Sequence, residues 1–146
     1  MGGGGMGGMG GMGGMMNVDP GKIGKIKVAT VCLEHGKQDP NPRVPYELRP
    51  IETFTENREV VELCKMLGRG EVAQNTAQAA AWHLTNGLTW DQLVVKDKVH
   101  LSNGYTEKYF APAEVAVAMR VVQETSRRAE VERAKGVGTS RSASQN

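Results

Sequence analysis

Cysteine is scarce in this chain of 146 residues, which contains only Cys32 and Cys64. Two cysteines cannot form the framework of several disulfides that holds many small secreted domains together. The histidines, His35, His83 and His100, lie far apart in the sequence and show no spacing typical of a zinc site. We therefore expect no resident metal and no other cofactor. The sequence leaves open whether Cys32 is a free thiol, is joined to Cys64 or is otherwise modified.

Long apolar runs and an excess of one charge are also missing. No stretch approaches the roughly 18 apolar residues that a membrane-spanning helix needs. The 18 basic and 16 acidic residues are mixed along the chain and give a net charge of +2, whereas a nucleic-acid binder usually carries a concentrated basic face. We expect neither a membrane span nor a nucleic-acid partner. An orthodox enzyme is not expected either, because no convergent set of nucleophile, base and orienting acid is visible.

The two ends of the chain differ in composition from the middle. Residues 1–16 are all glycine or methionine, and such a tract cannot bury enough apolar surface to offset the entropy of ordering its backbone. We predict a disordered linker over residues 1–21, a single globular domain over 22–135 and a disordered tail over 136–146. Alternatively, the methionine thioethers could bind copper(I). If a signal preceding the linker is missing from this chain, an exported or cell-surface location is favoured.

Strand signals occur at three places. Residues 25–33 alternate between two faces and are rich in β-branched side chains, which predicts a strand that carries Cys32. Residues 46–48 lie between prolines and predict a short edge strand. The pair Asn103-Gly104 between apolar residues predicts a hairpin.

Helix signals are stronger and end at recognisable caps. The pattern predicts a helix over 56–67 capped by Thr53 or Thr55, and an alanine-rich helix over 71–85 closed by Asn86-Gly87. A short helix to Val95 follows a capping box of Thr89 and Gln92. The last predicted helix runs from Pro112 to Lys135 and is stopped by Gly136. Together with the strands, these signals predict an α+β fold. We expect a small sheet of three to four strands packed against three to four helices.

The most distinctive stretch is Thr76-Ala77-Gln78-Ala79-Ala80-Ala81-Trp82-His83. On a helix, Gln78 lies one turn before Trp82, and the small residues around it would let a strand carrying Cys32 approach closely. A thiolate held dry against a carboxamide, with Trp82 excluding water, can displace ammonia and leave an internal thioester. His35, three residues after Cys32, would be a base or nucleophilic relay.

These local motifs resemble those of bacterial thioester domains, which occur in surface adhesins. Cys32-Leu33-Glu34 and Gln78-Ala79-Ala80-Ala81-Trp82 carry the resemblance. Val31 departs from the aromatic residue or leucine that is usual there, and the separation between Cys32 and Gln78 is short for that family. The resemblance implies a stored electrophile that reacts with an amine or hydroxyl group on a partner protein or surface.

The chain as a whole resembles an uncharacterised family of small proteins from planctomycete-type bacteria. Residues 28–37, 46–48 and 77–84 carry this second resemblance. It implies a bacterial protein, but no assigned function.

Simpler interpretations of the same residues stay open. Residues 75–78 fit a capping box in which Gln78 holds the start of a helix, and Cys32 fits a small buried strand residue. We hypothesise a non-enzymatic interaction or surface-attachment module, with or without a thioester between Cys32 and Gln78. The alternatives are an adaptor that binds a protein partner reversibly and a small hydrolase with Cys32 as nucleophile and His35 as base. The sequence does not indicate an oligomeric state.

Overall fold

Four α-helices and one two-stranded antiparallel sheet make up the fold over residues 18–142, the part of the chain that the computed structural model describes. The elements in chain order are the 3-10 helix η1 (Ile51–Thr53), α1 (Arg58–Gly68), α2 (Gln74–Asn86), α3 (Trp90–Val95), β1 (Asp97–His100), β2 (Thr106–Lys108) and α4 (Pro112–Ser142). The predicted α+β class and the predicted hairpin are confirmed. The sheet has two strands rather than the three to four that we expected.

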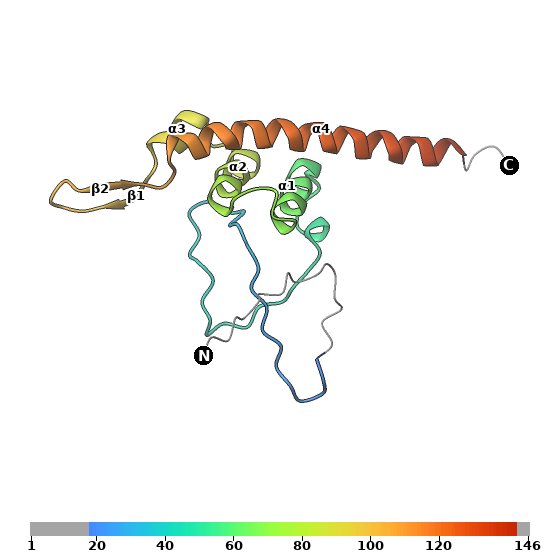
Figure 1. Ribbon diagram of the computed structural model, residues 1–146, viewed down its shortest axis with the longest axis horizontal. Coiled ribbons are helices and arrows are strands. Elements are labelled where there is room, and N and C mark those ends of the chain that lie inside the picture. The colour runs from blue at the N-terminus through green and yellow to red at the C-terminus, as the bar shows by residue number, and fades with distance from the viewer. Residues whose placement is uncertain (1–17, 143–146) are drawn as a thin grey trace, which may run out of the picture.

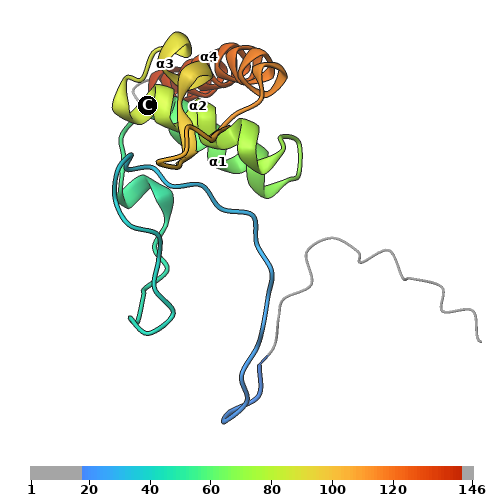
Figure 2. The same ribbon diagram turned by 90° about the vertical axis from the view of Figure 1, so that its left-hand side faces the viewer.

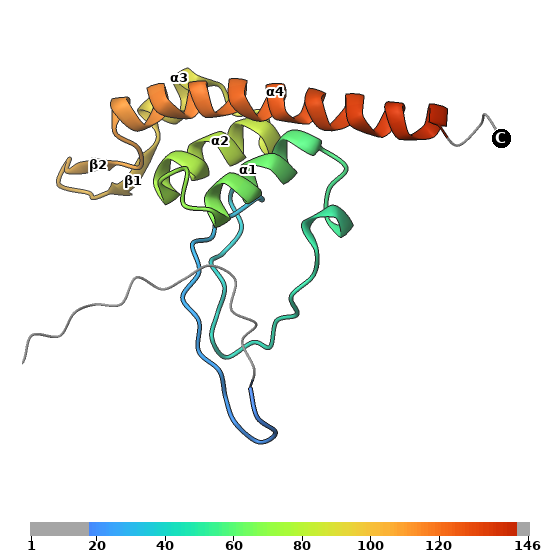
Figure 3. The ribbon, with the colours of Figure 1, turned by 45° about the vertical axis from the view of Figure 1, so that its right-hand side comes forward.

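The long helix α4 crosses over α1 and α2, which lie side by side beneath it (Figures 1 and 3). The hairpin of β1 and β2 projects past the beginning of α4 (Figure 1). Alanine side chains on α2 are small enough to let the helix axes approach closely, and they are fully buried in this interface. The core also contains larger buried residues from the other elements, namely Leu63, Leu67, Leu93, Phe110, Val115 and Val121.

Helix α1 begins later than its capping pattern predicted. Asn57 is the N-cap, and its side chain accepts a hydrogen bond of 2.9 Å from the backbone N–H of Glu59. Thr53 belongs to η1, where its hydroxyl donates to the carbonyl of Pro50. Thr55 accepts from the backbone N–H of Asn57. The prediction of Thr53 or Thr55 as the cap is therefore wrong, because both hydroxyls are used one turn before the helix.

The predicted C-terminal end of α2 is confirmed, whereas its predicted N-terminal end is wrong. Gly87 closes it in the left-handed conformation, with a φ of 67°, which glycine adopts at no steric cost. The helix begins at Gln74, behind Ala73, which provides no side-chain cap. The predicted capping box over residues 75–78 is wrong, because the amide of Gln78 bonds to a distant segment. The capping box of Thr89 and Gln92 at α3 is confirmed.

Helix α4 begins at Pro112 as predicted but does not stop at Gly136. Its helical backbone continues to Ser142, so the predicted tail over 136–146 is helical in its described part. Gly136 does not adopt a positive φ, and a glycine that keeps helical dihedrals lowers helix stability by only about 1 kcal/mol relative to alanine. On this helix Val121 and Thr125 are buried, whereas Met119 is 43% exposed.

The segment before α1 differs most from the prediction. Residues 18–50 contain neither helix nor strand, and much of this segment extends away from the helices (Figure 2). The predicted strands over 25–33 and 46–48 are therefore wrong. The backbone groups of Thr30 and Cys32 bond to side chains of α2 and have no neighbouring strand. The predicted linker over 1–21 lies mostly outside the described residues.

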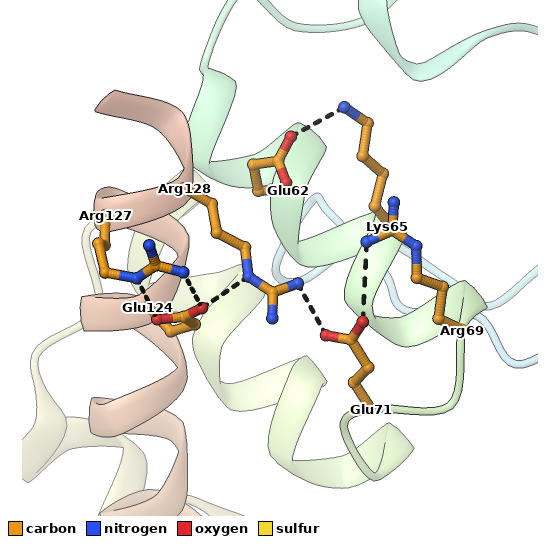
Figure 4. Close-up of polar contacts among 7 residues, drawn as sticks. All are labelled: Glu62, Lys65, Arg69, Glu71, Glu124, Arg127 and Arg128. Atoms are coloured by element: carbon orange, nitrogen blue, oxygen red, sulfur yellow. Dashed lines mark hydrogen bonds and ion pairs between the residues drawn. The ribbon is translucent and has the colours of Figure 1, made fainter. Parts of the chain in front are cut away.

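A cluster of ion pairs joins α4 to the connection between α1 and α2 (Figure 4). Glu124 accepts hydrogen bonds from Arg127 and Arg128, and Arg128 also reaches Glu71 at 2.7 Å. Glu124 and Arg128 lie four residues apart on α4, and their side chains form an ion pair at 2.7 Å. The hydrogen bonds from Arg127 and then from Arg128 lower the pKa of Glu124 from 4.5 to about 2.

Replacing Arg127 with alanine is expected to raise the pKa of Glu124 toward its ordinary value. The lowered pKa means that the stabilisation from this carboxylate is present above about pH 4.5 and is lost as the pH falls toward about 2. An NMR titration of the Glu124 carboxyl carbon measures both values. Arg133→Ala, on the same helix, is the matched control and should leave the titration unchanged. An ordinary pKa for Glu124 in the unmodified protein contradicts the assignment.

Candidate functional site

Residues 30–35, which we call the latch, cross one face of α2. Gln74 Nε2 donates to the carbonyl oxygen of Thr30 at 2.8 Å. Gln78 lies four residues after Gln74 on α2 and bonds to Cys32, two residues after Thr30. A four-residue step along a helix spans about 6 Å, and two residues of extended chain span about 6.6 Å. The two side-chain amides therefore match the repeat of an extended backbone, which explains why the latch lies on a helix instead of in a sheet.

The carboxamide of Gln78 is fully engaged by the backbone of Cys32. Its Oε1 accepts from the Cys32 N–H at 2.8 Å, and its Nε2 donates to the Cys32 carbonyl at 2.7 Å. The Gln78 side chain is buried and Cys32 is partly buried. At the end of the latch, the His35 N–H donates to Asn86 Oδ1 at 3.1 Å. The structure thus brings Cys32 and Gln78 together through main-chain contacts.

The thiol of Cys32 has its own partner within the latch. Its Sγ donates to the carbonyl oxygen of Glu34 at 3.1 Å. The other cysteine, Cys64, lies on α1, and the two are not joined by a disulfide. Burial raises the pKa of the Cys64 thiol, which keeps it in the unreactive protonated form. Cys32 is therefore the better candidate of the two cysteines for a chemical role.

Trp82 lies one turn after Gln78 and forms the centre of an aromatic cluster. Its ring meets the ring of His35 edge to face at 4.8 Å, and the rings of Tyr109 and Phe110 at 5.0 and 5.8 Å. Trp82 is only 6% exposed. Its indole Nε1 is buried without a hydrogen-bond partner among the described residues. The cluster gives the latch an apolar and water-poor neighbour.

Two residues of this site, Lys96 and Tyr109, were missed by the sequence analysis. Lys96 Nζ lies 5.4 Å from the centre of the Trp82 ring and 6.0 Å from that of Tyr109. The Tyr109 N–H donates to the Lys96 carbonyl at 2.8 Å, just beyond the hairpin pair of Asp97 and Lys108. Extending the hairpin pairing by one residue beyond Asp97 and Lys108 would have identified Lys96 and Tyr109 as neighbours.

The charges around the site alter two titrating groups. Burial, and then the cation of Lys96, lower the pKa of His35, so the neutral imidazole is favoured. Burial, and then the negative charge of Asp39, raise the pKa of Tyr109. The site therefore presents a neutral imidazole, a neutral phenol and one ammonium group close to Cys32.

Other residues singled out in the sequence have structural partners. His83 Nδ1 lies 2.8 Å from the carbonyl oxygen of Leu88, and its ring stacks on Trp90 at 4.0 Å. His83 therefore has a structural role at the end of α2. Among the described residues, no carboxylate is bonded to the ring of His35. The hydrolase alternative therefore gains no support, because no acid completes a triad with Cys32 and His35.

Over residues 18–142, no helix is both long and apolar enough to cross a membrane. No group of histidine, cysteine and carboxylate side chains suited to a metal ion occurs in the same part of the chain. The chain matches no family model, and no curated protein or solved structure is significantly similar to it.

Proposed function

We propose that this protein is an attachment module in which Cys32 and Gln78 form an internal thioester. The observation that carries the proposal is the pair of hydrogen bonds that hold the buried Gln78 carboxamide against the backbone of Cys32. Folding already holds the Gln78 amide carbon beside the cysteine that would attack it. The reaction therefore avoids much of the entropic cost of bringing and orienting the two groups, which is a large part of the barrier in many such reactions.

The same contacts suit the chemistry. The Cys32 sulfur attacks the Gln78 side-chain carbon, the carbon–nitrogen bond breaks, and ammonia leaves with the thiol proton. Negative charge develops on Oε1 during the attack, and the Cys32 N–H, at 2.8 Å, already donates to that atom. The thiol must first turn away from the Glu34 carbonyl to which it donates. The thioester then reacts with a nucleophile on a partner, which takes the acyl group and returns the Cys32 thiol.

A second candidate function is reversible binding of a protein partner. It is favoured by the large apolar side chains that the segment before α1 exposes to solvent, among them Leu48, which is 97% exposed, and Ile23, which is 88% exposed. Exposed apolar side chains in an extended segment suit pairing with the free edge of a sheet in another protein. In this case the latch is structural and no thioester forms.

The mass of the intact folded protein separates the two candidates. With a thioester, the protein is lighter than its sequence by one ammonia and gains methylamine when it is treated with that amine. Cys32→Ala must abolish both effects, whereas Cys64→Ala, the matched control, must keep them. A native mass equal to the sequence mass, together with ready alkylation of Cys32 by iodoacetamide, overturns the thioester and leaves reversible binding.

A further inference from the structure

The ammonium group of Lys96 is held beside the latch by contacts that do not involve an opposite charge. It lies over the Trp82 ring and beside the Tyr109 ring, at 5.4 and 6.0 Å from their centres. The backbone bond between Tyr109 and Lys96 fixes where this side chain leaves the main chain. Lys96 is partly buried, so water screens its charge less than it screens an exposed lysine.

This cation opposes one class of acceptor. An alkyl amine such as a lysine side chain is protonated at neutral pH, with fewer than about one molecule in a thousand neutral. Such an amine must approach Lys96 as a second cation or lose its proton beforehand. Like charges close together repel strongly wherever water is partly excluded. A neutral nucleophile has no such cost.

A second feature favours a neutral hydroxyl group. A hydroxyl is a weak nucleophile and needs a base to take its proton during attack. The imidazole of His35 contacts the Trp82 ring at 4.8 Å, one turn of α2 from Gln78. The lowered pKa of His35 favours the neutral form that can accept a proton. A free amine gains less from such a base, because its attack does not require prior loss of a proton.

We propose that the acceptor of this site is a neutral hydroxyl group, such as that of a carbohydrate, and that Lys96 sets the preference over protonated amines. This inference rests on the proposed thioester. The hydroxyl oxygen bonds to the Gln78 acyl carbon, the carbon–sulfur bond breaks, and the hydroxyl proton passes through His35 to the Cys32 sulfur. The products are an ester to Gln78 and a free Cys32 thiol, without oxidation or reduction.

The test compares two probes, glycerol and methylamine, on the folded full-length protein. The rate of each reaction is followed as the gain of probe mass by the intact protein. Lys96→Met should raise the ratio of methylamine rate to glycerol rate by about tenfold, since it removes the repulsion felt by the ammonium form. Lys96→Arg keeps the charge and should keep the ratio, as should Lys98→Met, which removes an exposed lysine of the hairpin.

A second variant tests the same preference in case Lys96→Met does not fold. His35→Gln should slow the reaction with glycerol more than the reaction with methylamine. An unchanged ratio in both variants overturns the acceptor preference while the thioester stands, and so does an unmodified protein that adds methylamine but no glycerol. Absence of the ammonia loss from every protein overturns the proposed function itself, and the acceptor preference with it.

Discussion

In the Gln78→Ala variant, the backbone amide of Cys32 should exchange with solvent roughly 30- to 140-fold faster than in the unmodified protein. The substitution removes both hydrogen bonds that hold Cys32 on α2. Leaving partly buried backbone groups unpaired costs about 2–3 kcal/mol, and each 1.4 kcal/mol is about a tenfold change in an equilibrium. Hydrogen exchange resolved by NMR at single amides measures the effect.

The latch should open as one unit, because its hydrogen bonds to α2 and the packing of Val31 and Leu33 on the core fall within six consecutive residues. The amide of His35, which bonds to Asn86, should therefore lose protection together with that of Cys32. Gln74→Ala is the control on the same face of α2. It releases only the carbonyl of Thr30, which lies in an exposed part of the latch, and should change the protection of Cys32 little. Unchanged exchange at Cys32 in Gln78→Ala would mean that the latch is held by other contacts.

Phe110→Ala should lower the free energy of unfolding by about 3–5 kcal/mol, the usual cost of removing a fully buried phenylalanine side chain. Phe110 is 1% exposed and lies between β2 and α4. Its ring packs against the rings of Tyr109 and Trp82 at 4.7 and 5.8 Å. The loss is a large share of the total stability of a small domain, which is about 5–15 kcal/mol.

Urea unfolding, followed by circular dichroism, measures this loss. Phe54→Ala is the matched control, because Phe54 is 57% exposed and its removal should change the free energy of unfolding by less than about 0.5 kcal/mol. Phe110→Leu, which keeps much of the volume, should have a smaller effect than Phe110→Ala. Similar losses in Phe54→Ala and Phe110→Ala are incompatible with the core described above.

The sequence predicted the helices and the hairpin well because their signals are local. Gly87 closes α2, the side chains of Thr89 and Gln92 cap α3, and Pro112 begins α4, each within a few residues of the element that it limits. The hairpin depends on the adjacent pair Asn103-Gly104. Such signals need no knowledge of which distant segments meet.

The failures concern partners that are distant in the sequence. The alternation over residues 25–33 predicted a strand, but the part of this segment that lies in the latch bonds to a helix. Here Gln74 and Gln78 supply the bonds that a neighbouring strand would have supplied. Both residues also fit the start of a helix, so the local pattern could not distinguish a cap from a long-range partner.

The candidate site was predicted in part. Cys32, Gln78, Trp82 and His35 come together as expected. The orientation of the Gln78 amide along the Cys32 backbone was not predicted. It depends on how far the latch is turned about its own axis, which no local sequence pattern specifies. Lys96 reaches the site only because the hairpin places Tyr109 beside it.

The most direct test of the thioester is tandem mass spectrometry of a proteolytic digest prepared without reduction at mildly acidic pH. We expect one cross-linked species that joins the peptide of Cys32 to the peptide of Gln78, with a mass lower than the sum of the two peptides by one ammonia. The contradicting result is two separate peptides, with Gln78 intact as a carboxamide and Cys32 available for alkylation.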